Sequence, residues 1–295
     1  MAGHVRLSFK TSPQHVDWAT LRDTWALAGQ LAVFEGVWMN DHLTDMAEPA
    51  GPSLEALTLA ATLAHLVPGR WIGHAVLSNT FRHPAVLAKA ATVMDHATGG
   101  RFILGLGAGW HEGEHAAFGL PLPPIGERID RLESAVAVIQ ALFSAAAGMP
   151  PGVTRPDPHY PLSGAIALPA PLTPGGPPVY LGGQRHRGIA LAARAAAGWL
   201  QPGTDAGDAA YFAARRAEVL RAMEAIGRDP AGFAFVGQVH VGPSAADGRV
   251  ALAQARRIAA AGATEVILGI AAAGGPEALR RLARDVAEPL RTELA

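Results

Sequence analysis

The stretch of sequence that decides the fold runs from Trp71 to Leu106 and reads WIGHAVLSNTFRHPAVLAKAATVMDHATGGRFILGL. Its first residues, Trp71 to Leu77, are mostly apolar and predict a strand. A helix is expected from Pro84 to about Ala97, because proline suits the first turn of a helix. Gly99-Gly100 ends that helix, and Arg101 to Leu106 predicts the next strand. A strand, a helix and another strand in this order are typical of a parallel sheet.

The same alternation extends over the rest of the chain. The other predicted strands are Val5–Phe9, Phe34–Met39, Val179–Leu181, Gly198–Gln201, Phe233–Val241 and Glu265–Leu268. The other predicted helices are Val16–Ala32, Ser53–Val67 with Ser53 as N-cap, Arg128–Ala145, Arg187–Ala197, Asp208–Ile226, Asp247–Ala261 and Pro276–Leu290. A length of 295 residues allows two domains of about 150 residues each. Eight strands, each followed by a helix, instead favour one α/β domain over residues 1–295, a (β/α)8 TIM barrel.

One Pro/Gly-rich segment, residues 146–178, interrupts the alternation after the fourth strand. Only Ile166–Leu168 in it has the composition of a strand. The segment is long for a structureless connection, so we expect an insertion, an excursion or a lid, and not a linker between domains.

Composition excludes several classes of protein. The chain has 24 basic and 25 acidic residues, which argues against binding to nucleic acid or to a membrane surface. It has no cysteine, which excludes disulfides, thiolate metal ligands and thiol nucleophiles. The first residues lack a signal-peptide pattern, and no apolar stretch reaches the ~18 residues of a membrane span, so we expect a cytoplasmic protein.

Polar residues and glycines gather where the predicted strands end, which is where TIM barrels carry their chemistry. Asp41 and His42 follow the second strand and are a candidate acid/base pair, because histidine titrates near neutral pH. The alternative is that Asp41 caps a loop and His42 packs beneath it. Gly182-Gly183, with Arg185 and Arg187 after them, predict a phosphate grip at a helix N-terminus; a plain turn is the alternative.

The stretch His111–His115 reads HEGEH and fits the HExxH pattern of zinc enzymes. That pattern needs a regular helix, whereas here Gly113 lies inside it and a glycine-rich strand end precedes it. No third ligand is evident in the sequence. We therefore expect a loop at the rim of the pocket and no metal site.

The chain resembles the luciferase-like monooxygenase superfamily, and within it most of all the branch that uses coenzyme F-420, an 8-hydroxy-5-deazaflavin. The matching pieces are Val37–Leu43, Arg82–Ala88, Asp95–Phe102, Leu104–Trp110 with Glu114 and Gly119, Pro178–Gly183 and Gly198–Leu200. They cover nearly the whole chain. The resemblance implies a (β/α)8 barrel with an insertion after strand four, a cofactor across the strand ends, and a homodimer.

The resemblance also implies roles for single residues. A non-proline cis peptide is expected at Ala75-Val76, behind the deazaflavin ring. Asp41 and His42 match a pair beside the reacting ring, with His42 the best candidate for proton transfer. The full set of expected cofactor-binding residues is Ala75, Val76, Asn79, Gly107, Ala108, Gly109, Trp110, Gly182, Gly183, Gln184 and Arg185.

The predicted function is hydride transfer between coenzyme F-420 and a small organic substrate. Trp110 stands where sugar-phosphate dehydrogenases of the superfamily carry a glutamate, which disfavours a sugar-phosphate substrate. With FMN as cofactor, the same pocket would serve a monooxygenase. A phosphate-binding isomerase or lyase without a redox cofactor is a further alternative, with Lys10 at the end of strand one, and a non-enzymatic cofactor-binding protein is another.

Overall fold

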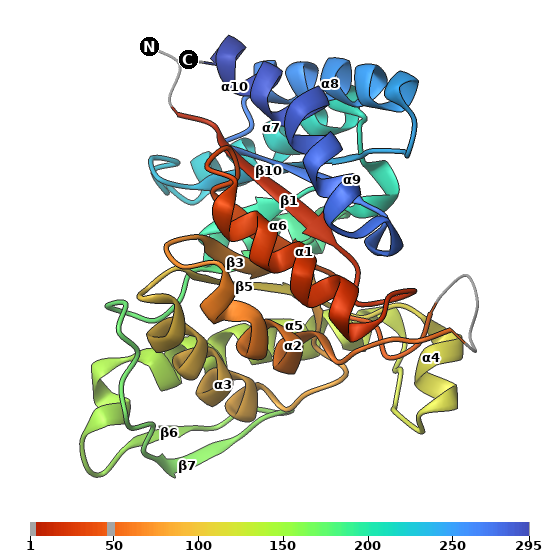
Figure 1. Cartoon of the computed structure of the whole chain (residues 1–295). Helices are drawn as coiled ribbons and strands as arrows, with labels where there is room; N and C mark the ends of the chain where they lie inside the picture. The colour runs from red at the N-terminus through yellow and green to blue at the C-terminus, as the bar shows by residue number, and fades with distance from the viewer. Residues whose placement is uncertain (1–3, 46–50, 295) are drawn as a thin grey trace.

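The computed structural model describes residues 4–45 and 51–294. One parallel sheet forms its centre, in the order β3-β2-β1-β11-β10-β9-β8-β5-β4 (Figure 1). Strand β3 also pairs with β5, which closes the sheet into a barrel. Strands β3 and β4 pair with successive parts of β5 and together form one stave, so the barrel has eight staves. The predicted TIM barrel is confirmed.

All eight predicted strands are present. They are β1 (Arg6–Thr11), β2 (Gly36–Met39), β3 (Trp71–His74) with β4 (Leu77–Ser78), β5 (Phe102–Gly107), β8 (Val179–Leu181), β9 (Gly198–Leu200), β10 (Ala234–His240) and β11 (Glu265–Ile270). The peptide bond between Ala75 and Val76 is cis, as the family resemblance implied.

The helices surround the barrel. They are α1 (Trp18–Gln30), α2 (Ala56–Leu63), α3 (Pro84–Thr98), α4 (Glu112–Ala117), α5 (Ile125–Phe143), α6 (His186–Ala195), α7 (Ala209–Ala225), α8 (Ala245–Ala260), α9 (Gly275–Leu282) and α10 (Glu288–Leu294). The expected N-cap of α2 was wrong: Glu55 accepts the Thr58 N–H, whereas the Ser53 hydroxyl donates to the His42 carbonyl oxygen. No helix within residues 4–45 and 51–294 is long and apolar enough to cross a membrane.

The lumen of the barrel is filled by side chains and is not a pore. Its apolar layer consists of Trp38, Ile103, Tyr180, Leu200, Val236 and Ile267. Glu265 lies fully buried beside this layer and accepts hydrogen bonds from Ser8 Oγ at 2.6 Å and from Trp38 Nε1 at 2.7 Å. Because buried polar groups need such partners, this carboxylate is a satisfied part of the core. A ligand can therefore enter only at the ends of the strands.

The Pro/Gly-rich segment lies between α5 and β8 and carries two short antiparallel strands, β6 (Val153–Arg155) and β7 (Leu162–Ala165). The prediction of a strand at Ile166–Leu168 was wrong. These residues follow β7, and the ladder already ends at Ala165, where it pairs with Val153.

The same segment packs along the outside of α3. The Tyr160 ring meets His83, the N-cap of α3, at 5.2 Å between centroids. Near the other end of α3, the Thr173 hydroxyl donates to Asp95 at 2.8 Å. Figure 1 shows β6 and β7 at the lower left, away from α4. The segment therefore adds to the outer layer of the barrel, and its contacts do not support the alternative of a lid.

Candidate active site

His42 and Glu114 form the centre of the candidate site. His42 lies just after β2, and Glu114 lies in the first turn of α4, which follows the end of β5. Nδ1 of His42 lies 3.2 Å from Oε2 of Glu114, and both residues are buried. An ionised carboxylate only accepts hydrogen bonds, so Nδ1 carries a proton and donates it. The other ring nitrogen, Nε2, can therefore exchange a proton with a bound ligand.

The backbone fixes Glu114 in place. Its Oε1 accepts hydrogen bonds from the N–H groups of Leu43 and Thr44, the two residues after His42. In the sequence, Glu114 is marked only as a position that matches the family pattern. The signal that could have found it is its place three residues after the N-cap His111, which puts it in the first turn of a helix at a strand end.

Asp41, the expected partner of His42, has a different environment. Its buried carboxylate forms a two-pronged ion pair with Arg82, at 2.7 Å to Nη1 and 2.9 Å to Nη2. Its Oδ2 also accepts the Ser78 backbone N–H at 2.9 Å. Both oxygens are committed, so Asp41 ties the end of β2 to the end of β4. The contacts favour the alternative in which Asp41 holds a loop.

Arg82 extends this ion pair to α2. It also donates to Glu55, the residue that caps α2. Burial of Glu55 tends to raise its pKa, but hydrogen bonds from Thr58 and Arg82 outweigh that effect and lower the pKa to about 2. Asp41, Arg82 and Glu55 thus fix β2, α2 and the loop after β4 relative to one another.

The HEGEH stretch is helical, against the expectation of a rim loop. His111 caps α4 by accepting the Glu114 N–H on Nδ1 at 3.0 Å. His115 is buried, with Nε2 2.6 Å from the Thr80 hydroxyl and Nδ1 2.8 Å from the His111 carbonyl oxygen. Both rings therefore have partners in the protein. In the part of the chain that the structure describes, no group of three or more His, Cys, Asp or Glu is placed to hold a metal ion.

Val76 lies between the two glycine turns that were expected to hold a cofactor. A Cβ on Gly107 would lie 2.5 Å from Val76 Cγ2, and a Cβ on Gly182 would lie 3.4 Å from Val76 Cγ1. The structure thus brings together the expected residues at the ends of three neighbouring staves, β3/β4, β5 and β8. Ala75 and Val76 are part-buried here, with bare backbone on either side.

Asn79 supplies an unpaired polar atom at this place. Its backbone N–H donates to the Gly107 carbonyl oxygen at 2.9 Å, which anchors it beside the β5 turn. Its side-chain Oδ1 is buried and has no hydrogen-bond partner. Leaving a buried acceptor unpaired costs about 1–3 kcal/mol. A planar cofactor with a ring N–H would satisfy this oxygen, so the residues present fit such a group.

The turn after β5 is held against the loop after β4. Gly109 has φ +78°, and a Cβ there would lie 2.5 Å from Thr80 Oγ1, so glycine is required. Arg128 of α5 donates to the Gly109 carbonyl oxygen at 2.6 Å. Ala108 is part-buried, whereas Trp110 is 61% exposed and meets the His42 ring edge-on at 5.9 Å.

The predicted phosphate grip is only partly assembled. A Cβ on Gly183 would lie 2.5 Å from the backbone of Gly188, so this glycine is explained by packing against α6. Arg185 occupies the N-cap position of α6, but its side chain forms no capping hydrogen bond. The first N–H groups of this helix are therefore open to an anion. Gln184 and Arg185 are both exposed. The expectation for Arg187 was wrong, because it pairs with Asp130 of α5.

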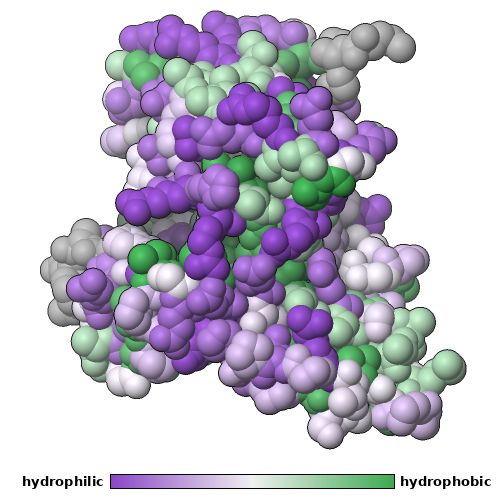
Figure 2. All heavy atoms as spheres, turned by 180° about the vertical axis from the view of Figure 1, so that it is seen from behind, coloured by the Kyte–Doolittle hydropathy of each residue, from purple (hydrophilic) through white to green (hydrophobic). Residues whose placement is uncertain are grey.

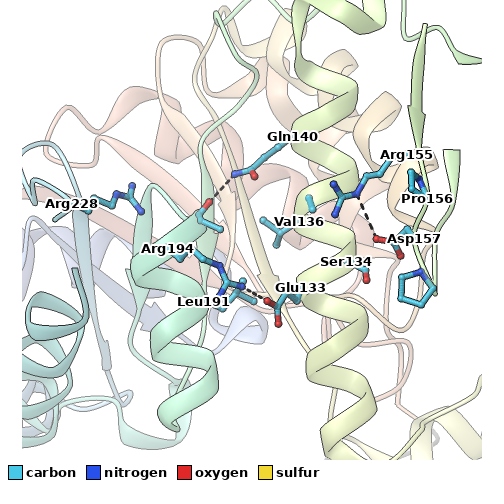
Figure 3. Close-up of a pocket in the computed structure, with 13 residues that line it drawn as sticks. Glu133, Ser134, Val136, Gln140, Arg155, Pro156, Asp157, Leu191, Arg194 and Arg228 are labelled. Atoms are coloured by element: carbon cyan, nitrogen blue, oxygen red, sulfur yellow. Dashed lines mark hydrogen bonds and ion pairs between the residues drawn. The ribbon is translucent and has the colours of Figure 1, made fainter. Parts of the chain in front are cut away.

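Two cavities border these elements. A cavity of about 740 Å³ lies on the outside of the barrel, between α5 and α6 (Figure 3). Arg194 pairs with Glu133 there and Arg155 with Asp157, and the cavity contains none of the expected site residues. A smaller cavity of about 270 Å³ is lined by Leu43, Glu55, Phe81, Arg82, Phe118 and Leu120 and adjoins the candidate site.

Several curated proteins of related sequence are F-420-dependent dehydrogenases by name. F-420-dependent glucose-6-phosphate dehydrogenase from Microbacterium testaceum is 29% identical over 197 residues, which are 66% of this chain and 56% of that protein. F-420-dependent hydroxymycolic acid dehydrogenase from Mycobacterium tuberculosis is 31% identical over 234 residues, 75% of this chain and 61% of that protein. The chain thus spans little more than half the length of these relatives.

Some solved structures share the fold over their whole length. An F-420-dependent secondary alcohol dehydrogenase in complex with an F-420–acetone adduct has a TM-score of 0.82 at 14% identity, covering 99% of this chain and 100% of that chain. A monooxygenase from Streptomyces bottropensis has a TM-score of 0.78 at 17% identity, with 99% and 100% covered. At these identities, the likeness shows the fold alone.

The sequence pattern of one family spans nearly the whole barrel. The family described as luciferase-like monooxygenase matches residues 4–288, from just before β1 to the first residue of α10. That range includes every strand of the barrel and both residues of the His42–Glu114 pair. The chain belongs to the luciferase-like monooxygenase family.

Proposed function

We propose that this chain is an oxidoreductase that transfers a hydride between coenzyme F-420 and a small organic substrate. The observation that carries the proposal is the buried His42–Glu114 pair, which lies at the same end of the barrel strands as the bare backbone around Val76. Curated relatives that are named F-420-dependent dehydrogenases support the choice of cofactor.

The chain's residues fit the cofactor at three points. When bound, the deazaflavin supplies two-electron hydride chemistry. The Val76 side chain would support the ring, and the unpaired Oδ1 of Asn79 would accept a hydrogen bond from a ring N–H. The uncapped N-terminus of α6, at His186, would receive a phosphate group near Gly182.

His42 is the proposed proton donor or acceptor for the substrate oxygen. Oxidation of an alcohol removes a hydride from carbon and a proton from oxygen, and a base must take that proton. Glu114 fixes the tautomer in which Nδ1 is protonated and Nε2 is the exchanging nitrogen. The pair is buried and largely shielded from water, which strengthens such a contact.

An FMN-dependent monooxygenase is the second candidate. The fold likeness to a monooxygenase from Streptomyces bottropensis supports keeping it. Titration of the full chain with oxidised coenzyme F-420 and separately with FMN, followed by cofactor fluorescence, tests both. We expect saturable binding of F-420 and weaker binding of FMN. Tight FMN binding without F-420 binding would overturn the proposal in favour of the second candidate.

The Asn79→Ala variant makes this titration specific to the site. Loss of the Oδ1 acceptor should weaken F-420 binding by about tenfold, the effect of one hydrogen bond in a buried site. Gln140→Ala is the matched control, since the Gln140 amide donates to Ala195 on the outside of the barrel. Equal affinities in the wild type and in Asn79→Ala would remove Asn79 from the cofactor site.

We also propose that the enzyme works as a homodimer in the cytoplasm, with which a chain without cysteine is compatible. The Pro/Gly-rich segment 146–178 exposes more than half of each of four apolar side chains, and Figure 2 shows apolar surface at the lower right, where this segment lies. These side chains are Met149, Ile166, Leu168 and Leu172. Sedimentation velocity should find a dimer that Leu168→Asp disrupts and that Val250→Asp, on α8, leaves intact. A monomeric wild type would contradict the proposal.

A further inference from the structure

The barrel mouth has a second polar group opposite the candidate cofactor residues. In the closed order of staves, β10, β11 and β1 lie four steps away from β3/β4, β5 and β8, respectively. They are therefore diametrically across the mouth from Val76, Gly107 and Gly182. Any substrate that reaches a cofactor on one side must contact residues on the other side.

Lys10, Gly269 and His240 meet at the carboxyl ends of these three strands. Gly269 of β11 is the register partner of both Lys10 on β1 and His240 on β10. A Cβ on Gly269 would lie 3.0 Å from His240 Nδ1 and 3.6 Å from Lys10 Cε. The two basic side chains thus flank a position that carries no side chain. The missing side chain leaves both of them open toward the mouth.

Among the described residues, the ammonium group of Lys10 hydrogen-bonds to a neutral amide and not to a carboxylate. Its Nζ donates to the neutral amide oxygen of Gln238 at 2.5 Å, and no carboxylate within residues 4–45 and 51–294 forms an ion pair with it. An ammonium has three N–H donors, so further donors are left for a ligand. Burial lowers the pKa of Lys10 to about 8, which reflects the cost of a charge removed from water.

His240 contributes a second polar face. Its Nε2 lies 3.1 Å from the Gly203 carbonyl oxygen, which can only accept, so Nε2 carries a proton. Burial, and then the charge of Lys10, lower the pKa of His240 below its ordinary value. A ring that is neutral presents Nδ1 as an acceptor, which suits a hydroxyl group beside an anion held by Lys10.

We propose that Lys10, with Gly269 and His240 beside it, forms a subsite for an anionic oxygen group of the substrate, a carboxylate or a phosphate group. The inference rests on the proposed function for the position of the substrate in this mouth, and it adds the substrate's chemical class. An anion here would pair with the part-buried ammonium and offset its desolvation. The substrate is thus expected to carry its reacting carbon toward Val76 and its charge toward Lys10.

The test uses the fact that the chain has only two lysines, Lys10 and Lys89. Lysine labelled with carbon-13 at Cε gives the full-length protein two side-chain signals, assigned with Lys10→Met and Lys89→Met. Lys89 is exposed on α3 and serves as an internal control for ionic strength. The labelled protein, with coenzyme F-420 present and also without it, is titrated with acetate, inorganic phosphate and neutral acetamide.

We expect the Lys10 signal to shift saturably with acetate or with phosphate and not with acetamide, while the Lys89 signal stays in place. Tighter binding of acetate would indicate a carboxylate substrate, and tighter binding of phosphate a phosphate ester. Gly269→Ala places a methyl group between Lys10 and His240 and should lower the affinity for the anion by at least about tenfold. Gly126→Ala, at an open position, is the control.

Parallel, unsaturable shifts of both lysine signals would overturn the subsite, and so would equal responses to acetamide and acetate. Failure of the proposed function looks different. In that case the fluorescence of coenzyme F-420 does not change when the protein is added, whether or not the Lys10 signal responds to anions.

Discussion

Nδ1 of His42 lies 3.2 Å from Oε2 of Glu114, although 72 residues separate the two in sequence. The contact joins the loop after β2 to the helix after β5, and the Leu43 and Thr44 amides fix the carboxylate in that position. A histidine held by a carboxylate in this way has one defined tautomer and one defined orientation. The account of the site depends on this pair.

Replacement of His42 by Ala should abolish most turnover and leave cofactor binding in place. The loss of a positioned general acid or base costs about 10²–10⁴-fold in rate. The measurement is steady-state bleaching of oxidised coenzyme F-420 with a panel of secondary alcohols, together with the binding titration. Unchanged kcat in His42→Ala would remove the histidine from proton transfer.

Glu114→Gln should disturb the tautomer of His42 and not merely the stability of the fold. An amide can donate as well as accept, so it no longer requires a proton on Nδ1. The Leu43 and Thr44 N–H groups keep the amide oxygen of the variant in the Oε1 position, so the amide NH2 faces Nδ1 and donates to it. Nitrogen-15 shifts of the His42 ring should therefore change from the tautomer protonated at Nδ1 to the one protonated at Nε2, and kcat should fall more than KM changes. A lower melting temperature with unaltered ring shifts and kcat would show that Glu114 is only structural.

Asp41→Ala should destabilise the fold strongly, because it leaves the partly buried Arg82 without the carboxylate that pairs with both Nη1 and Nη2. Breaking a buried ion pair costs about 3–5 kcal/mol. Asp23→Ala is the matched control, since Asp23 pairs with Arg22 at the exposed surface, where the cost is about 0–1 kcal/mol. Urea denaturation of the two variants measures the difference. Equal free energies of unfolding would contradict the structural role of Asp41.

The Arg82–Glu55 contact predicts a dependence of stability on pH. The pKa of Glu55 is lowered from its ordinary 4.5 to about 2, so the ionised form is favoured in the folded chain. Its contribution to stability is complete above about pH 4.5 and is lost as the pH falls toward about 2. The stability difference between the wild type and Glu55→Gln, measured by urea denaturation, should therefore shrink below pH 4.5. A difference that grows on acidification has the wrong sign for this account.

The sequence predicted the barrel because each strand and helix has a local signal. Pro84 and Gly99, for example, mark the two ends of α3. Some local expectations failed, and the HEGEH stretch shows why. The HEGEH stretch forms helix α4 despite Gly113, because His111 caps that helix and His115 bonds to Thr80. Tertiary contacts such as these override the weak preference of a single glycine.

The site was less predictable, because its pairings join distant segments. No spacing rule shows that Asp41 pairs with Arg82 and Glu55, nor that Glu114 is the partner of His42. The three-dimensional closure of the barrel alone brings them together. The resemblance to a family did indicate the cis bond at Ala75-Val76, a feature of backbone geometry that composition and periodicity do not encode.

Transfer of deuterium tests the central claim most directly. The full chain is incubated without oxygen with oxidised coenzyme F-420 and secondary alcohols, including hydroxy acids, that carry deuterium on the carbinol carbon. Mass spectrometry of the reduced cofactor should then find one deuterium, transferred at a rate that falls sharply in His42→Ala. Cofactor that stays oxidised with every alcohol, while added reduced FMN supports oxygen consumption and substrate hydroxylation, would contradict the account.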